Sequence, residues 1–191
     1  GIFILLNESG IRVGPSGQID AANIILATRN LDTSDFLDGD YLFRRLSKDQ
    51  LDILLLNEGT IQVQDGGFGV LIAGAIDNKG KIIAPTGKIA LAAGDAIRLD
   101  ISGNGLISVA IDEPTASTVF DYEGNPVTKQ ITSTGTLDAQ GGTVILKAES
   151  INDVFTKAIN LEGVVRGGKV AESGGVIRIV ADGDVEIGAD I

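Results

Sequence analysis

The stretch "NEGTIQVQDGGFGVLIAGAIDNKGKIIAPTGKIALAAGD", residues 57–95, contains nearly the same phrase twice. Gly59-Thr60-Ile61 returns 21 residues later as Gly80-Lys81-Ile82, and Ile72-Ala73-Gly74 returns 20 residues later as Ala92-Ala93-Gly94. Both copies consist of short aliphatic runs separated by glycine-bearing turns, with no helical phrase between them. A period near 20 with these features is typical of a β-solenoid, in which like residues of successive coils stack into ladders.

The same phrasing continues beyond residue 95 with a longer spacing. Gly135-Thr136-Leu137 and Gly163-Val164-Val165 repeat the first phrase 28 residues apart, so their loops carry insertions. A leucine-rich repeat has a similar period, but its L-x-x-L-x-L-x-x-N register does not run through these phrases. We therefore predict an all-β fold, a β-solenoid of roughly eight coils, because neighbouring strands would lie about 4.8 Å apart.

Two segments interrupt the repeat. Residues 31–52 are polar and acidic, and aromatic residues such as Phe36 and Phe43 are expected to pack back on the scaffold. Residues 112–132 contain two of the four prolines. We predict one β-helix domain over residues 1–191 with excursions near these two segments. Because the chain opens on an aliphatic run, we expect a strand already in progress and therefore a piece of a longer protein.

The composition narrows the class of protein. Apolar residues make up 43% of the chain but include only six Phe, two Tyr and no Trp, which suits the narrow interior of a solenoid. A net charge of −11 repels phosphate backbones and anionic membrane surfaces, so we expect no nucleic-acid partner. No run of 18 apolar residues occurs, so we expect no membrane insertion, and no signal peptide opens the chain.

The chain has no cysteine and no histidine. Their absence removes disulfides, thiolate chemistry, the commonest transition-metal ligand and the commonest general base. Three of the glycine pairs do not open a helix and are not followed by Lys-Ser or Lys-Thr, so we assign them to turns rather than to phosphate loops. These pairs are Gly66-Gly67, Gly141-Gly142 and Gly174-Gly175. We predict no catalytic residues and no cofactor.

Acidic residues cluster in two places. The clusters are Asp32, Asp35, Asp38 and Asp40, and Asp182, Asp184 and Asp190. Clustered carboxylates are the ligands that calcium prefers, but these spacings match neither the EF-hand loop nor the glycine-rich calcium repeat. We interpret both clusters as solvated loops and predict no metal site.

Five phrases occur in a fixed order over essentially the whole chain. They are residues 5–11 ("LLNESGI"), 35–43 ("DFLDGDYLF"), 57–61 ("NEGTI"), 87–94 ("GKIALAAG") and 105–109 ("GLISV"). In this order they resemble the amino-terminal secretion domain of filamentous haemagglutinin-like exoproteins, the two-partner secretion family. The first phrase is similar to the family's Asn-Pro-Asn-Gly-Ile motif.

The resemblance implies a right-handed parallel β-helix with extra-helical loops or hairpins. It also implies an outer-membrane two-partner secretion transporter as partner, and a secreted or cell-surface location in a Gram-negative-type bacterium. The motif-like residues are Asn7, Glu8, Ser9, Gly10 and Ile11, with Glu8 and Ser9 standing where the family has Pro and Asn. From their residue types alone, the same positions are an ordinary Asn/Gly turn between strands.

Three functions follow as hypotheses. The first is an adhesin segment: a secretion domain that serves export and forms the base of an adhesive rod, with a host or cell-surface receptor. The second is a segment of an extracellular filament, built by end-to-end association through the open strand edges of the solenoid. The third, a polysaccharide-active β-helix enzyme, is disfavoured because aromatic platforms and basic residues that would hold sugars are scarce.

Overall fold

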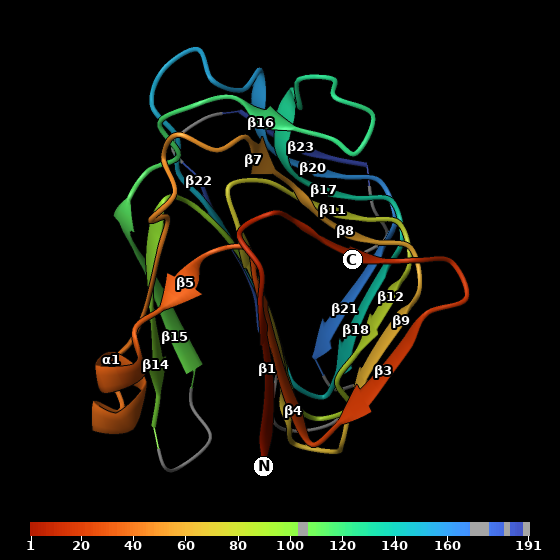
Figure 1. Ribbon diagram of the computed structural model, residues 1–191. Helices are drawn as coiled ribbons and strands as arrows, with labels where there is room; N and C mark the ends of the chain where they lie inside the picture. Colours follow the sequence, from red (N-terminus) through yellow and green to blue (C-terminus); the bar gives the residue numbers. More distant parts are fainter. Residues whose placement is uncertain (103–106, 169–175, 182–183, 189–191) are drawn as a thin grey trace.

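Three parallel sheets form a right-handed β-helix in the computed structural model, which describes residues 1–102, 107–168, 176–181 and 184–188 (Figure 1). The first sheet contains, in order, β1 (Ile2–Leu6), β4 (Asn23–Ala27), β10 (Phe68–Ala73), β13 (Lys88–Ala93), β19 (Thr143–Ala148) and β22 (Val176–Ala181). The second contains β2 (Ile11–Val13), β8 (Leu55–Asn57), β11 (Ile76–Asn78), β17 (Lys129–Ser133), β20 (Lys157–Leu161) and β23 (Val185–Ile187). The third contains β3 (Gln18–Ala21), β9 (Thr60–Val63), β12 (Lys81–Ile83), β18 (Thr136–Gln140) and β21 (Val164–Gly168).

Each of the first five coils contributes one strand to each sheet, and β22 and β23 continue the first two sheets, so the predicted solenoid is confirmed. The expected number of coils was wrong, because no sheet of the described residues has more than six strands. The difference arises because the chain leaves the helix between β4 and β8 and again between β13 and β17, and spends those residues on extra-helical elements.

The extra-helical elements form a second layer beside the helix (Figure 1). An antiparallel sheet has the order β15 (Ile107–Glu113), β14 (Ala96–Ile101), β6 (Tyr41–Arg44) and β5 (Asn30–Leu31). A short parallel pair joins β7 (Asp52–Ile53) to β16 (Val119–Phe120). The helix α1 (Thr33–Asp38) connects β5 to β6. No helix in the described part of the chain is long and apolar enough to cross a membrane.

The extra-helical layer explains why the strands of the first sheet are continuously apolar. The inner face of this sheet fills the helix with residues such as Leu71 and Leu91, while its outer face packs Ile72 against Phe43 and Ile97 of the antiparallel sheet. A sheet buried on both faces needs aliphatic residues at every position rather than at alternate ones. Phe43 is therefore buried as predicted, whereas Phe36 lies on α1 and stays exposed.

The repeated glycines mark a corner where successive backbones nearly touch. A Cβ atom added to Gly80 would lie 2.1 Å from the carbonyl oxygen of Gly59, and one added to Gly135 would lie 2.0 Å from that of Gly80. The next strands pair in register, with Lys81 opposite Thr60 and Thr136. The first phrase of the repeat thus returns in each coil because only glycine fits this corner.

Asp77 on β11 is a largely buried carboxylate of the second sheet whose charge is only partly compensated. Its Oδ1 atom is buried without a hydrogen-bond partner, and Lys79 lies 3.6 Å from Oδ2. Burial raises the pKa of the Asp77 carboxyl, against the smaller opposing effect of Lys79. Folding therefore takes up a proton between the unfolded and the folded pKa, and stability falls as the pH rises through that window.

We expect Asp77→Asn to raise the free energy of unfolding at neutral pH by up to about 1 kcal/mol, because the amide removes the buried charge. The gain should disappear at a pH below the unfolded pKa, where Asp77 is protonated in both states. Urea denaturation of both proteins at neutral and at acidic pH measures this difference. A loss of stability at neutral pH would show instead that the Lys79 ion pair outweighs the burial of the charge.

Candidate functional site

The turn at Asn7–Gly10 joins the first two strands of the first coil, β1 and β2. Asn7 Oδ1 accepts a hydrogen bond from the Ser9 N–H at 3.0 Å, and the Gly10 N–H donates to the Asn7 carbonyl at 3.1 Å. The Asn7 N–H in turn donates to the carbonyl of Ala27 in the next coil at 3.0 Å. The motif-like residues therefore form a self-bonded turn fixed to the helix, which is the local role that asparagine and glycine suit.

Gly10 and Ile11 set the end of this turn. Gly10 has φ +103°, and a Cβ atom there would lie 2.8 Å from both Ile53 Cγ2 and Tyr122 Oη. Ile11 is buried in the helix interior. Because a side chain at position 10 would collide with Ile53 and Tyr122, the turn can pass under the extra-helical segments only with glycine there.

Tyr122 is itself affected by this packing. Burial raises the pKa of the Tyr122 hydroxyl to about 12, although the Arg12 guanidinium lies 5.9 Å from the centre of its ring and acts in the opposite direction.

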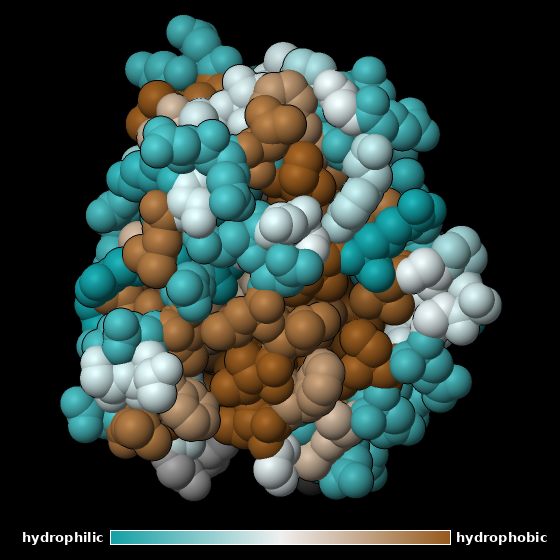
Figure 2. All heavy atoms as spheres, viewed as in Figure 1, coloured by the Kyte–Doolittle hydropathy of each residue, from teal (hydrophilic) through white to brown (hydrophobic). Residues whose placement is uncertain are grey.

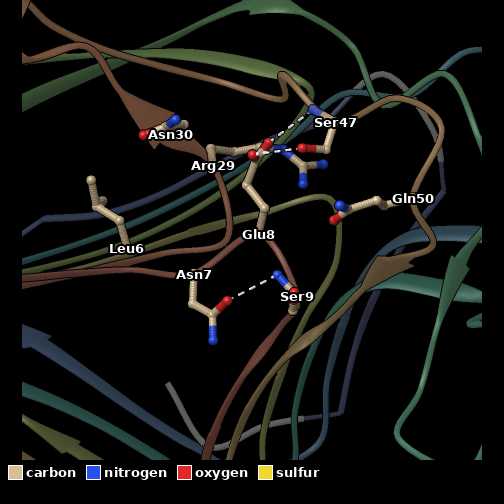
Figure 3. Close-up of a pocket in the computed structure, with 8 residues that line it drawn as sticks. All are labelled: Leu6, Asn7, Glu8, Ser9, Arg29, Asn30, Ser47 and Gln50. Carbon is tan, nitrogen blue, oxygen red and sulfur yellow. Dashed lines mark hydrogen bonds between the residues drawn. The ribbon is translucent and has the colours of Figure 1, made fainter.

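Glu8 connects the turn to a distant segment, residues 45–51. Its Oε1 accepts from the backbone N–H groups of Leu46 at 2.8 Å and Ser47 at 3.2 Å, and its Oε2 accepts from Ser47 Oγ at 3.0 Å. Figure 3 shows the Glu8 side chain extended towards Ser47, away from Asn7. A carboxylate with three such bonds holds the two segments together more firmly than a neutral side chain would.

A pocket of about 330 Å³ lies between the turn and the 45–51 segment (Figure 3). It is lined by Leu6, Asn7, Glu8, Ser9, Arg29, Asn30, Ser47 and Gln50. Three of these residues bring side-chain amides, and two bring charges that are already paired within the protein. The pocket is therefore polar but offers no unpaired charge to a ligand.

A buried ion cluster lies behind this pocket. The guanidinium of Arg29 donates to Asp52 through two bonds of 2.8 Å, to Asp95 Oδ1 at 3.0 Å and to the Gly94 carbonyl at 2.9 Å. Arg29 and Asp52 are almost completely buried. A buried guanidinium is tolerated only when its donors are satisfied, and here every nitrogen has an acceptor.

The cluster fixes both excursions of the chain to the helix. Asp52 belongs to β7, and Asp95 lies between β13 and β14, where its Oδ2 accepts from the Ala116 N–H at 3.2 Å. Arg45 extends the cluster, since its Nη1 donates to Ser117 Oγ and its Nη2 donates to the Gln50 carbonyl at 2.9 Å. Residues 45–51 are thus held by the contacts of Arg45 as well as by those of Glu8.

The described members of the two acidic clusters cap a helix, pair with an arginine or face the solvent. Asp32 caps α1, where the Ser34 hydroxyl and the Ser34 N–H donate to its carboxylate at 2.6 and 2.8 Å and lower its pKa. Asp40 pairs with Arg98 at 2.6 Å. Asp184 is exposed, and Asp182 and Asp190 lie outside the described residues. Within the described ranges, no three acidic side chains converge as metal ligands would.

The three parallel sheets and the extra-helical antiparallel sheet together define the class of protein as a parallel β-helix domain with extra-helical elements. A family model for the TPS secretion domain matches residues 2–188, so the chain belongs to the two-partner secretion domain family. The predicted resemblance is therefore confirmed.

One solved structure extends this finding. The crystal structure of the HMW1 secretion domain from Haemophilus influenzae is 25% identical to this chain, with a TM-score of 0.73. The match covers 99% of this chain and 47% of the HMW1 chain, so the present chain spans about half of that relative's length. The search of curated protein sequences gives no match.

Proposed function

We propose that this chain is the secretion domain of a larger, secreted exoprotein and that an outer-membrane transporter recognises it for export. The observation that carries the proposal is the family match over residues 2–188, which covers almost the whole chain. The Asn7–Gly10 turn is the recognition element in this proposal, because its internal hydrogen bonds join residues within four positions and do not require the rest of the β-helix to be folded. We assign no catalytic activity to the domain.

The solenoid supplies a physical mechanism for folding after export. Each described strand of the helix pairs only with strands of the neighbouring coils, so a coil can dock as soon as the preceding one is formed. Folding outside the cell can therefore start at one end and proceed along the chain. The finished domain would form the base of an adhesive rod at the cell surface, with receptor binding left to other parts of the exoprotein.

The proposal predicts that Asn7→Ala lowers export severalfold while the domain still folds. The substitution removes the acceptor for the Ser9 N–H in an exposed turn, which should cost only about 0.5–1.5 kcal/mol of stability. The measurement is the amount of chain released into the medium from cells that also produce its partner transporter. Thermal unfolding of the purified variant checks that the domain is folded.

Asn125→Ala provides a matched control for this experiment. Asn125 lies in another exposed turn, where its side chain bonds Asp121 at 3.3 Å. Export of this variant should equal that of the wild type. If both variants were exported normally, or if the wild type reached the medium without a transporter, the proposed recognition would be wrong.

End-to-end association is a second candidate function, favoured by exposed apolar side chains on β1. Phe3 and Leu5 are 44% and 39% exposed, whereas Ile24 and Leu26, their partners in the next coil, are fully buried. The molecule shows a broad apolar area at the lower centre of Figure 2, in the region of β1 and β4 in Figure 1. Sedimentation and electron microscopy test this candidate, since fibres would support it and monomers at high concentration would exclude it.

A further inference from the structure

We propose that the two excursions form a clasp that closes only when both are present, so that residues 23–120 fold as one unit rather than coil by coil. The clasp is the buried cluster of Arg29, Asp52 and Asp95 together with the extra-helical strands around it. Its use in export rests on the proposed function, whereas its closure is a property of the chain by itself.

The strands of the first excursion have their partners in the second. β6 pairs with β14, where Phe43 lies opposite Ile97. β7 pairs with β16, where Asp52 lies opposite Val119, as the two strands at the top of Figure 1 show. In the described part of the chain, β7 has no other partner strand. The backbone hydrogen bonds of the first excursion therefore stay incomplete until the second excursion is in place.

The arginines of the first excursion also depend on the second. Arg29 donates to Asp95 Oδ1 at 3.0 Å and to the Gly94 carbonyl at 2.9 Å, although these acceptors lie 66 and 65 positions further along the chain. Arg45 donates to Ser117 Oγ, which lies 72 positions further along. The Arg29 side chain is only 1% exposed, and a buried donor without an acceptor costs free energy. Arg29 can therefore settle in its buried position only after residues 94 and 95 have arrived.

The second phrase of the repeat, which ends in Gly74 and again in Gly94, makes room for this cluster. A Cβ atom added to Gly74 would lie 2.4 Å from Asp52 Oδ2 and 2.5 Å from Arg29 Nη2. The Gly74 carbonyl accepts from Thr115 Oγ1 of the second excursion at 3.1 Å, and the Gly94 carbonyl accepts from Arg29. Three neighbouring strands of the first sheet, β4, β10 and β13, thus end at one buried cluster.

The coils that follow β13 lack such a connection. No described strand after β16 belongs to an extra-helical sheet, so these coils can dock one at a time on the finished unit. For a chain that emerges amino-terminal end first, folding then has one long step that ends near Phe120, followed by short steps. Closing loops over such distances makes the long step the slow one.

The test unfolds the purified chain in an optical trap, held by a cysteine added at each end. The chain has no cysteine of its own, so the two attachment points are unique. Residues 23–120 should lengthen in a single step of roughly 30 nm, since an extended residue spans about 0.34 nm. The later coils should come apart in separate steps of roughly 10 nm or less. Coil-sized steps throughout would overturn the inference, and so would one step for the whole chain.

Asp95→Ala shows whether the buried cluster is what joins the excursions. Asp95 accepts from both Arg29 and the Ala116 N–H, so its loss should split the large step into coil-sized ones. Asp138→Ala is the matched control, because Asp138 pairs with Arg166 at 3.3 Å outside the clasp, and its large step should keep its length. A single large step in Asp95→Ala would contradict the role of the cluster. The wild-type steps decide the inference by themselves if this variant does not fold.

The experiment needs no transporter, so it separates the clasp from the proposed function. Coil-sized steps in the wild type would overturn the clasp and leave recognition by the transporter untouched. Normal export of the Asn7→Ala variant would overturn the recognition element and leave the clasp untouched.

Discussion

Replacing Gly80 by alanine is expected to lower the free energy of unfolding by about 2–4 kcal/mol. The added Cβ atom would lie 2.1 Å from the Gly59 carbonyl oxygen, and that oxygen is fixed because it accepts from the Lys81 N–H at 2.8 Å. The neighbouring backbone cannot move away without breaking the parallel pairing of the two coils. The effect is steric rather than conformational, since Gly80 does not occupy the left-handed region. Urea denaturation followed by circular dichroism measures the loss.

Gly14→Ala is the matched control for the corner glycines. Gly14 has ordinary backbone angles, and a Cβ atom there would have no neighbour within 4 Å. We expect this variant to be as stable as the wild type or slightly more stable, because alanine restricts the unfolded chain. Equal effects of the two substitutions would mean that the coils can separate at the corner, and would contradict the explanation given for the repeat.

The same corner explains how much of the fold could be predicted from the sequence. The glycine phrase must return in each coil because of a contact between adjacent backbones, so its period reports the solenoid directly. The number of coils could not be predicted in this way. Ile107–Glu113 has the short alternating pattern of a strand in the β-helix, yet it pairs antiparallel with Ala96–Ile101 in the extra-helical sheet. Strand pattern alone does not say which sheet a strand will join.

The candidate site was predictable only in its local part. The Asn7–Gly10 turn follows from residue types within four positions, and the structure has it where the sequence places it. The partners of Glu8 lie 38 and 39 positions away, and those of Arg29 lie up to 66 positions away. These contacts depend on the path of the two excursions. The available signal was Arg29 itself, a charged residue two positions after the buried strand Asn23–Ala27. A buried charge at this place needs a buried partner.

Asp52→Asn is expected to cost about 3–5 kcal/mol, because it removes one partner from a buried ion cluster. The carboxylate now accepts two bonds of 2.8 Å from Arg29, whereas an asparagine would offer one acceptor and turn a donor towards the guanidinium. Arg29 would keep Asp95 at 3.0 Å, but its charge would remain buried and only partly compensated. Chemical denaturation measures the total loss, and hydrogen exchange of residues 45–52 measures how far the segment is released.

Two comparisons decide whether the charge is the cause. Asp40→Asn removes an ion pair of similar length at 2.6 Å, but Asp40 and Arg98 are exposed, so the loss should be far smaller. Adding Arg29→Met and Asp95→Asn to Asp52→Asn should recover part of the stability, because the charge of Arg29 is then removed, while Arg45, which is 9% exposed, still lacks the carboxylate of Asp52. If Asp52→Asn cost no more than Asp40→Asn, Asp95 alone would satisfy Arg29. The excursions would then be held to the helix mainly by the apolar packing of Phe43 and Ile97 against the first sheet.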